Sequence, residues 1–183
     1  INQLRGDQGG TLTGRLSYSH PNLQQLPNYN EYGTAIRSIF SPNSNEEKWG
    51  CFDYSQQEPR LVVHFALRTP GIIGVDTMAK AFHEDPSTDF HQIVADIAAI
   101  DRKQAKTINL GLFYGMGVAK LQDQLGINDE EEAKKLIANY HYKVPFVKQL
   151  MKETMNRAQT VGRIRTIAGR FCRFDKWEPK DWN

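Results

Sequence analysis

The sequence is poor in cysteine: Cys51 and Cys172 are its only two among 183 residues. Two cysteines do not provide the disulfide framework of a small secreted domain, so a reducing compartment is the default expectation. An excess of charge of one sign is also lacking, because the formal net charge is only +2. Any binding to nucleic acid must therefore come from a local patch rather than from the charge of the whole chain.

Long apolar runs are missing as well. No stretch approaches the roughly 18 apolar residues of a membrane span, and no signal peptide begins the chain, so we expect no membrane partner. There is no internal repeat and no low-complexity run. The composition, 39% hydrophobic and 24% charged, is typical of a globular protein of one or two domains. The first residue is Ile1 rather than Met, which predicts a piece of a longer protein.

A local basic patch is present near the C-terminus. Five arginines fall within seventeen positions there, namely Arg157, Arg163, Arg165, Arg170 and Arg173.

The segment from Asp101 to Gly115 has the most informative spacing. Arg102, Lys106 and Tyr114 stand at offsets 0, 4 and 12, which on a helix spread over roughly 120° of one side and about 18 Å of length. Asp101 is a candidate N-cap, and the helix start favours a nearby anion. The pattern fits a nucleoside triphosphate, with cations for phosphates and a ring for a base. A solvated amphipathic helix fits the spacing equally well.

A second candidate site follows an apolar segment, residues 49–54, which we interpret as a buried strand. Asp53 lies at its end, a rigid position that suits a divalent metal held by few carboxylates and by substrate phosphates. Asp53 is equally able to cap the following helix. Ser55 and Glu58 fit a capping box, and Pro59 fits the first helical position with Glu58 at the cap.

The remaining pattern predicts a helical middle with short strands on both sides. We expect strands at 36–40 and 49–54, and helices at 60–67, 76–82, 89–100 and 119–125. A further helix capped by Asn128 is interrupted at Pro145 and continues to about Thr160, and a hairpin covers 161–174. This order indicates an α+β fold, with a helical domain inserted into a sheet domain.

Five ordered segments together resemble the family A, or Pol I type, DNA polymerases. Asp53-Tyr-Ser-Gln-Gln-Glu-Pro-Arg60 resembles motif A, and Arg102-x3-Lys106-x7-Tyr114-Gly115 resembles motif B on the fingers. The others are Thr13-Gly-Arg-Leu-Ser with Pro21-Asn-Leu-Gln-Gln-Leu-Pro27, Asp89-Phe-His91, and the run from Asp129 to Arg173. The resemblance implies a partial antiparallel palm sheet with an inserted, mainly helical fingers domain. It divides the chain into palm (1–67), fingers (68–140) and a return to the palm (141–183).

The resemblance also implies roles in template-directed transfer of a deoxynucleotide from dNTP to a primer. Asp53 and the carbonyl of Tyr54 would bind two Mg²⁺ ions. Arg102 and Lys106 would hold the triphosphate with His91 nearby, and Lys106 would assist the leaving pyrophosphate.

Further roles concern the sugar, the base and the duplex. Glu58 would crowd the sugar C2′ and reject ribonucleotides. Tyr114 would stack near the template base and interact with Glu58, and Gln56 belongs to the same nucleotide-binding set. Primer–template contacts would come from Arg15, Asn22, Gln24 and Arg170.

The chain departs from the family pattern in three respects. Leu110 replaces the usual Phe or Tyr beside the sugar, and Gln57 and Pro59 replace Ile and Leu. The H-D-E of motif C does not occur in the 183 residues, so we expect thumb, remaining palm and any exonuclease domain elsewhere in the parent chain. We therefore expect that these residues alone do not extend a primer, because one Asp cannot replace a pair of metal-bridging carboxylates.

Two other functions share these features. A single-subunit RNA polymerase has a similar Lys-x7-Tyr-Gly helix, although Glu58 and the Asn22–Gln24 segment argue against it. A non-catalytic DNA-binding module of the same fold is the third possibility, although Arg102 and Lys106 are retained. Gln56-Gln57-Glu58-Pro59-Arg60 looks more like phage-type members than cellular repair enzymes, which predicts the cytoplasm of a bacterium or of a phage-infected host.

Overall fold

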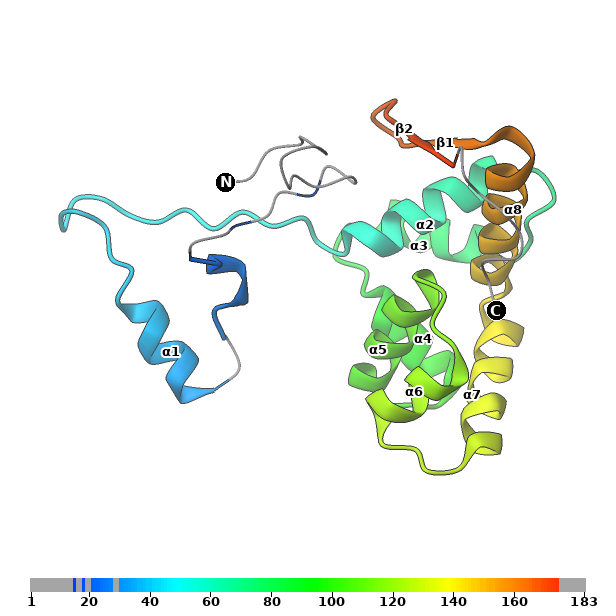
Figure 1. Ribbon diagram of the computed structural model, residues 1–183, viewed down its shortest axis with the longest axis horizontal. Coiled ribbons are helices and arrows are strands. Elements are labelled where there is room, and N and C mark those ends of the chain that lie inside the picture. The colour runs from blue at the N-terminus through cyan, green and yellow to red at the C-terminus, as the bar shows by residue number, and fades with distance from the viewer. Residues whose placement is uncertain (1–14, 16–17, 19–20, 28–29, 175–183) are drawn as a thin grey trace. The chain divides into compact units, whose positions relative to one another are not determined.

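The computed structural model describes residues 15, 18, 21–27 and 30–174. Its chain divides into two compact units, Ile1–Asp53 and Tyr54–Asn183. Figure 1 labels the helices and strands of both units. The division at residue 53 falls between Asp53 and Tyr54, inside the motif A segment. The three-part division into palm, fingers and palm stays a prediction.

The first unit has little regular structure in its described part. A short 3₁₀-helix, η1, covers Leu23–Gln25, and an α-helix, α1, covers Glu31–Ser38. Asn22 and Asn30 cap these helices, each accepting a backbone N–H within its own first turn. Arg37 donates to the carbonyls of Pro27 and Leu26, at 3.0 and 3.2 Å, and so links α1 to the segment after η1.

The second unit is a helical assembly that ends in a hairpin. Its elements are α2 (Gln57–Arg68), α3 (Asp76–Glu84), α4 (Phe90–Ala98), α5 (Arg102–Phe113), α6 (Val118–Leu125), α7 (Glu130–Lys143), α8 (Pro145–Val161), β1 (Arg163–Arg165) and β2 (Phe171–Arg173). The two strands pair antiparallel. The α+β fold class is confirmed, with helices dominating and a small antiparallel sheet.

Local chemistry sets the helix boundaries. Asp101 accepts from the backbone N–H groups of Lys103 and Gln104, which confirms it as the N-cap of α5. Pro145 is the first residue of α8, where its missing N–H costs no helical bond. Gly162 ends α8 at φ +66°, a left-handed conformation that glycine adopts without a Cβ penalty.

One hydrophobic core holds the second unit together. Phe90 of α4, Ile108 of α5, Leu121 of α6, Tyr140 of α7 and Phe146 of α8 are all almost completely buried within it. The Phe90 ring lies 5.9 Å from that of Phe113 and 6.5 Å from that of Phe146, measured between centroids. The core thus fixes α4 and α5 against α8. Side chains on the outer faces of α4 and α5 therefore project from well-packed helices.

Two predicted strands are wrong. Residues 36–38 belong to α1, and Ile39 and Phe40 follow it as exposed side chains. Residues 49–54 form no strand and are exposed, with Phe52 at 97% of its maximal exposure. Apolar character predicts a strand only where a neighbouring strand can accept its hydrogen bonds, and no such neighbour lies beside 49–54 among the described residues.

The predicted start of two helices is also wrong by one or two residues. Asp129, not Asn128, caps α7 by accepting from the N–H of Glu131. Gln56, rather than Glu58 or Ser55, is the N-cap of α2, and it forms no side-chain cap bond. Pro59 is tolerated as the third helical residue because its backbone nitrogen is among the first-turn positions that lack an intrahelical acceptor.

No helix in the described ranges is long and apolar enough to cross a membrane.

Candidate nucleotide-binding site

Tyr114 and Glu58 meet across two helices. The Tyr114 Oη donates to Glu58 Oε1 over 2.9 Å, although the residues are 56 positions apart. Glu58 lies in the first turn of α2, and Tyr114 is the C-cap of α5. The contact expected between these two side chains is therefore present. Both are exposed, so they are available to a ligand while they hold each other in place.

Arg102 is paired rather than free at the start of α5. Its Nε and Nη2 donate to the same Oδ2 of Asp89, at 2.7 and 2.6 Å. The other oxygen of Asp89 caps α4 by accepting from the N–H groups of His91 and Gln92. Partial burial raises the pKa of Asp89, but the hydrogen bonds from Arg102 and from these N–H groups outweigh it and lower the pKa. A carboxylate at this position is thus kept ionised.

His91 is buried, at 5% exposure, and faces an equally buried amide. Its Nδ1 lies 2.9 Å from Nδ2 of Asn109 on α5. With the amide nitrogen facing Nδ1, Nδ1 is the acceptor and the neutral ring carries its proton on Nε2, while the buried Oδ1 of Asn109 has no hydrogen-bond partner among the described residues. Burial lowers the pKa of His91, and the positive charges of Arg102 and Lys106 lower it further against the opposing carboxylates Asp89 and Glu58. His91 is therefore a neutral N–H donor.

Four charged residues act on the pKa of His91, and three of them, Glu58, Arg102 and Lys106, are predicted site residues. Asp89, Arg102, Lys106 and Glu58 all influence it electrostatically, and they come from α2, α5 and the cap of α4. Lys106 is exposed and forms no ion pair within the described residues. A mixed set of two cations, a neutral imidazole and two carboxylates suits a polyanionic ligand that carries hydroxyl groups.

Gln56 is used by the fold. Its Nε2 donates to the carbonyl of Thr88 over 2.6 Å, and its Oε1 accepts from the N–H of Phe90 over 2.7 Å. Gln56 has φ +51°, a left-handed conformation that is costly for a residue with a Cβ. The side chain thus joins the start of α2 to the start of α4, and through α4 it supports the position of His91.

A hollow of about 530 Å³ opens beside the end of α5. Leu110 and Tyr114 line it from α5, together with Thr107, Gly111, Gly115, Met116, Gly117, Lys120 and Gln124. Leu110 is half-buried there, so an aliphatic side chain lines this hollow. Gly115 turns the chain at φ +77° directly after Tyr114, and both residues line the hollow.

The other predicted residues belong to other segments of the chain. Asp53 closes the first unit and Tyr54 opens the second, and both are exposed. Arg15, Asn22 and Gln24 belong to the first unit and are exposed, whereas parts of the Thr13–Ser17 segment lie outside the described residues. Arg170 is exposed in the turn of the hairpin. Within the described ranges, no group of three or more His, Cys, Asp or Glu side chains could hold a metal.

Sequence reasoning missed the roles of Asp89 and Asn109. Asp89 was noted only as part of a motif, and its pairing partner is 13 residues away. Asn109 gives no signal of its own, because an Asn in a helix is ordinarily a surface residue. Its position four residues after Ala105 and three before Leu112 could have indicated an inward-facing polar group, since these two apolar residues share its face and are buried.

The chain matches one family of known proteins. The model of DNA polymerase family A matches residues 4–183. A DNA-directed DNA polymerase of Pseudomonas phage M6 is 38% identical, over 100% of this chain and 34% of its own length. A thermostable DNA polymerase I of Thermus filiformis is 36% identical, over 91% of this chain and 20% of its own length.

A solved structure has the same fold. It is the POL domain of Pol1 from M. smegmatis in complex with DNA primer-template and dNTP, with a TM-score of 0.71 and 29% identity, covering 94% of this chain and 31% of that one. The chain belongs to DNA polymerase family A. It spans about a third of the length of the phage relative, 34%.

Proposed function

We propose that the chain is the dNTP-binding part of a DNA-directed DNA polymerase that transfers deoxynucleotides to a primer 3′-OH on a template. The observation that carries the proposal is that Tyr114 is bonded to Glu58 while the charges of Glu58, Arg102 and Lys106 act on His91, which links residues from three parts of the second unit. Family membership and the DNA and dNTP in the complex of the M. smegmatis relative support it.

The residues divide the recognition of the nucleotide between them. Lys106 is an exposed cation for the triphosphate and the candidate proton donor to the leaving pyrophosphate. His91 presents Nε2–H as a neutral donor beside it. Arg102 reaches the phosphates while it remains fixed by Asp89, which reduces the entropy lost on binding. Glu58, held by Tyr114, presents an oxygen against a ribose hydroxyl.

Mg²⁺ is the cation that this donor set fits, because the chain offers hard oxygen ligands in the Asp53 carboxylate and the Tyr54 carbonyl. One carboxylate with substrate phosphates is an ordinary Mg²⁺ arrangement. Bound Mg²⁺ would supply charge neutralisation at the reacting phosphate. A second carboxylate and the primer-binding thumb would come from the rest of the parent chain. We place the parent enzyme in the bacterial cytoplasm, that of a phage-infected host included.

Primer extension by the parent enzyme tests the role of Lys106. We expect Lys106→Ala to reduce kcat by about 10²- to 10⁴-fold, the range for loss of a general acid. Lys103→Ala, one turn earlier on α5 and also exposed, is the matched control and should remain near the parent rate. Equal rates for both variants would refute the assignment.

Nucleotide choice tests the polymerase type. We expect the parent enzyme to prefer dNTP over NTP, and Glu58→Ala to reduce this preference because the ribose hydroxyl no longer meets a carboxylate. A preference for NTP would instead support a single-subunit RNA polymerase. The 183-residue chain alone should bind dNTP weakly and should not extend a primer. Incorporation by that chain would contradict the need for a second carboxylate.

A further inference from the structure

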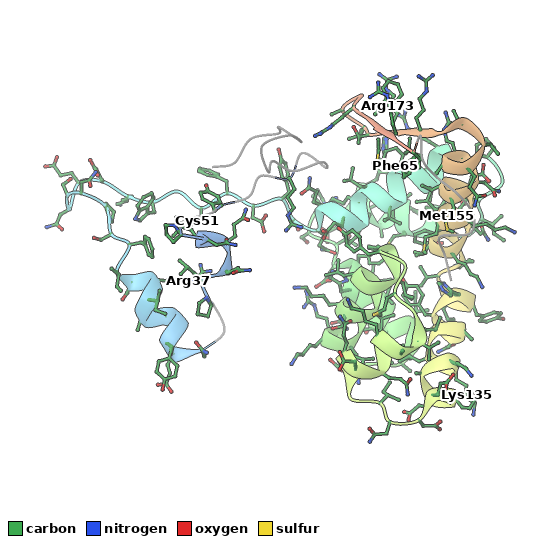
Figure 2. The ribbon with its side chains drawn as sticks, viewed as in Figure 1. Arg37, Cys51, Phe65, Lys135, Met155 and Arg173 are labelled. Carbon is green, nitrogen blue, oxygen red and sulfur yellow. The ribbon has the colours of Figure 1, made fainter. Side chains whose placement is uncertain are left out.

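The hairpin after α8 carries charge of only one sign. Residues 157–174 contain the five arginines named above and no lysine, aspartate or glutamate. Arginine presents a planar fork of donors that matches phosphate oxygens, whereas lysine acts as a point charge. Figure 1 shows the hairpin at a margin of the second unit, next to the end of α8, and Figure 2 labels Arg173 on it.

Strand register gathers three of these arginines on one face. Arg163 is directly opposite Arg173, and Arg165 is opposite Phe171. Because side chains alternate along a strand, these four share a face, and Ile164 lies on the other. The three arginines are exposed. Residues two apart on a strand are separated by roughly 7 Å, so the guanidinium groups form a short row rather than a single point of charge.

Within residues 30–174 the row of arginines has no carboxylate partner. Like charges directly opposite each other destabilise a strand pair. Among the described residues, no carboxylate forms an ion pair with any of the three arginines. A surface that holds several cations in register is complementary to a ligand with repeated negative charges.

Phe171 orders two of the guanidinium groups. Those of Arg163 and Arg165 lie 4.9 and 5.9 Å from the centroid of its ring. Arg165 also lies against Gly169, where a Cβ would approach its Nη2 to 3.1 Å. Stacking uses the flat face of a guanidinium and leaves the in-plane N–H donors for a ligand. The side-chain entropy lost on binding is thereby smaller.

We propose that Arg163, Arg165 and Arg173 form a surface for the DNA phosphate backbone, which extends beyond the contact expected of Arg170. The choice of DNA as the polyanion rests on the proposed function. The contacts reach phosphates and not bases, so the surface binds without sequence preference. Because Arg170 lies in the turn of the same hairpin, a duplex that contacts Arg170 would also pass along this surface.

The proposal is tested by measuring how the DNA affinity of the 183-residue chain depends on salt. The measurement needs neither dNTP nor catalysis. Each phosphate contact contributes about 0.9 to the slope of log K against log salt for duplex DNA. We expect R163Q/R165Q/R173Q to lower the slope by about 2 to 3. Between about 50 and 200 mM salt, wild-type affinity should then fall about 40-fold more than that of the variant.

Matched variants separate a specific surface from loss of charge. K135Q/K143Q/K152Q removes three exposed charges from α7 and α8 and should keep the wild-type slope. R163K/R165K/R173K keeps the charges and should keep most of the slope while binding more weakly, because the forks and the ring stacking are lost. If the glutamine variant does not fold, R163K/R165K/R173K still tests the proposal through its weaker DNA binding at nearly unchanged slope.

Two results would overturn the proposal. One is an equal slope for the wild type and R163Q/R165Q/R173Q. The other is displacement of DNA by polyglutamate at equal charge, which would assign the surface to an acidic protein. A normal slope change together with a fully active Lys106→Ala parent enzyme would refute the proposed nucleotide site and leave the hairpin surface intact.

Discussion

Asp89 joins the start of α4 to the start of α5 by using its two oxygens for different tasks. Oδ1 accepts from the backbone of α4, and Oδ2 accepts twice from the guanidinium of Arg102. The position of Arg102 therefore depends on a helix cap one element earlier. This arrangement explains how Arg102 can be exposed by half, with 51% of its side chain accessible, and still have one defined orientation.

The two tasks of Asp89 can be separated by substitution. Asp89→Asn keeps a good N-cap and loses the ion pair, so we expect a loss of unfolding free energy below about 1 kcal/mol. Asp89→Ala loses both and should cost about 1 to 3 kcal/mol. Urea unfolding of the 183-residue chain measures both values. Equal losses would show that the cap contributes nothing and that the ion pair carries the whole effect.

Gln56 provides a second separable link. Gln56→Ala removes hydrogen bonds to Thr88 and Phe90, and we expect a loss of about 1 to 3 kcal/mol. Gln56→Gly removes the same bonds but relieves the left-handed strain at φ +51°, so it should be the less harmful change. Thermal melts of the two variants compare them. A glycine variant that is clearly less stable than the alanine variant would contradict this account.

Ala99 offers a stabilising substitution. It ends α4 in the left-handed conformation, at φ +55°, where glycine carries no Cβ penalty. We expect Ala99→Gly to raise the unfolding free energy by about 0.5 to 1 kcal/mol. Ala138→Gly, at an exposed position inside α7, is the control and should lower it by about 1 kcal/mol. Chemical denaturation should show opposite signs for the two changes.

We expect the unfolding free energy to fall in mild acid because of two histidines, His91 and His141. Burial lowers the pKa of His91 and of His141, and Lys148 lowers that of His141 further. Below the unfolded pKa of 6.5 the unfolded chain binds more protons than the folded one, so stability is full above pH 6.5 and is lost as the pH falls towards the folded pKa values. The pKa of Asp89 is lowered too, but its contribution to stability is lost only when the pH falls below about 3.8.

Unfolding free energies between about pH 7.5 and pH 5 check the prediction. His141→Gln should reduce the pH dependence, because one of the two histidine contributions is removed. His83→Gln changes an exposed histidine of α3 and should leave the pH dependence as it was. A wild-type stability that rises on acidification through this range would contradict the lowered pKa values.

Much of the candidate site was predictable because its residues act through local chemistry. The Asp101 cap, the cationic face of α5, the turn at Gly115 and the Pro145 break each depend on a few neighbouring residues. The hairpin predicted over 161–174 was predictable for the same reason, because alternating residues close together in the sequence specify an antiparallel pair. Helix starts were less certain where two capping residues compete, as at Asn128 and Asp129.

The sequence alone determined the family, the α+β class, the helical spacing of Arg102 and Lys106, and the clustering of arginines after Arg157. Only the tertiary structure decided that Asp89 holds Arg102, that Asn109 faces His91, and that Gln56 supports the backbone of α4. It also decided that Arg163 and Arg173 lie opposite each other, and that residues 49–54 are exposed. The physical reason is that these relationships depend on which distant groups packing brings within hydrogen-bond reach. Apolar pattern and residue spacing record only what lies within a few turns or along one strand.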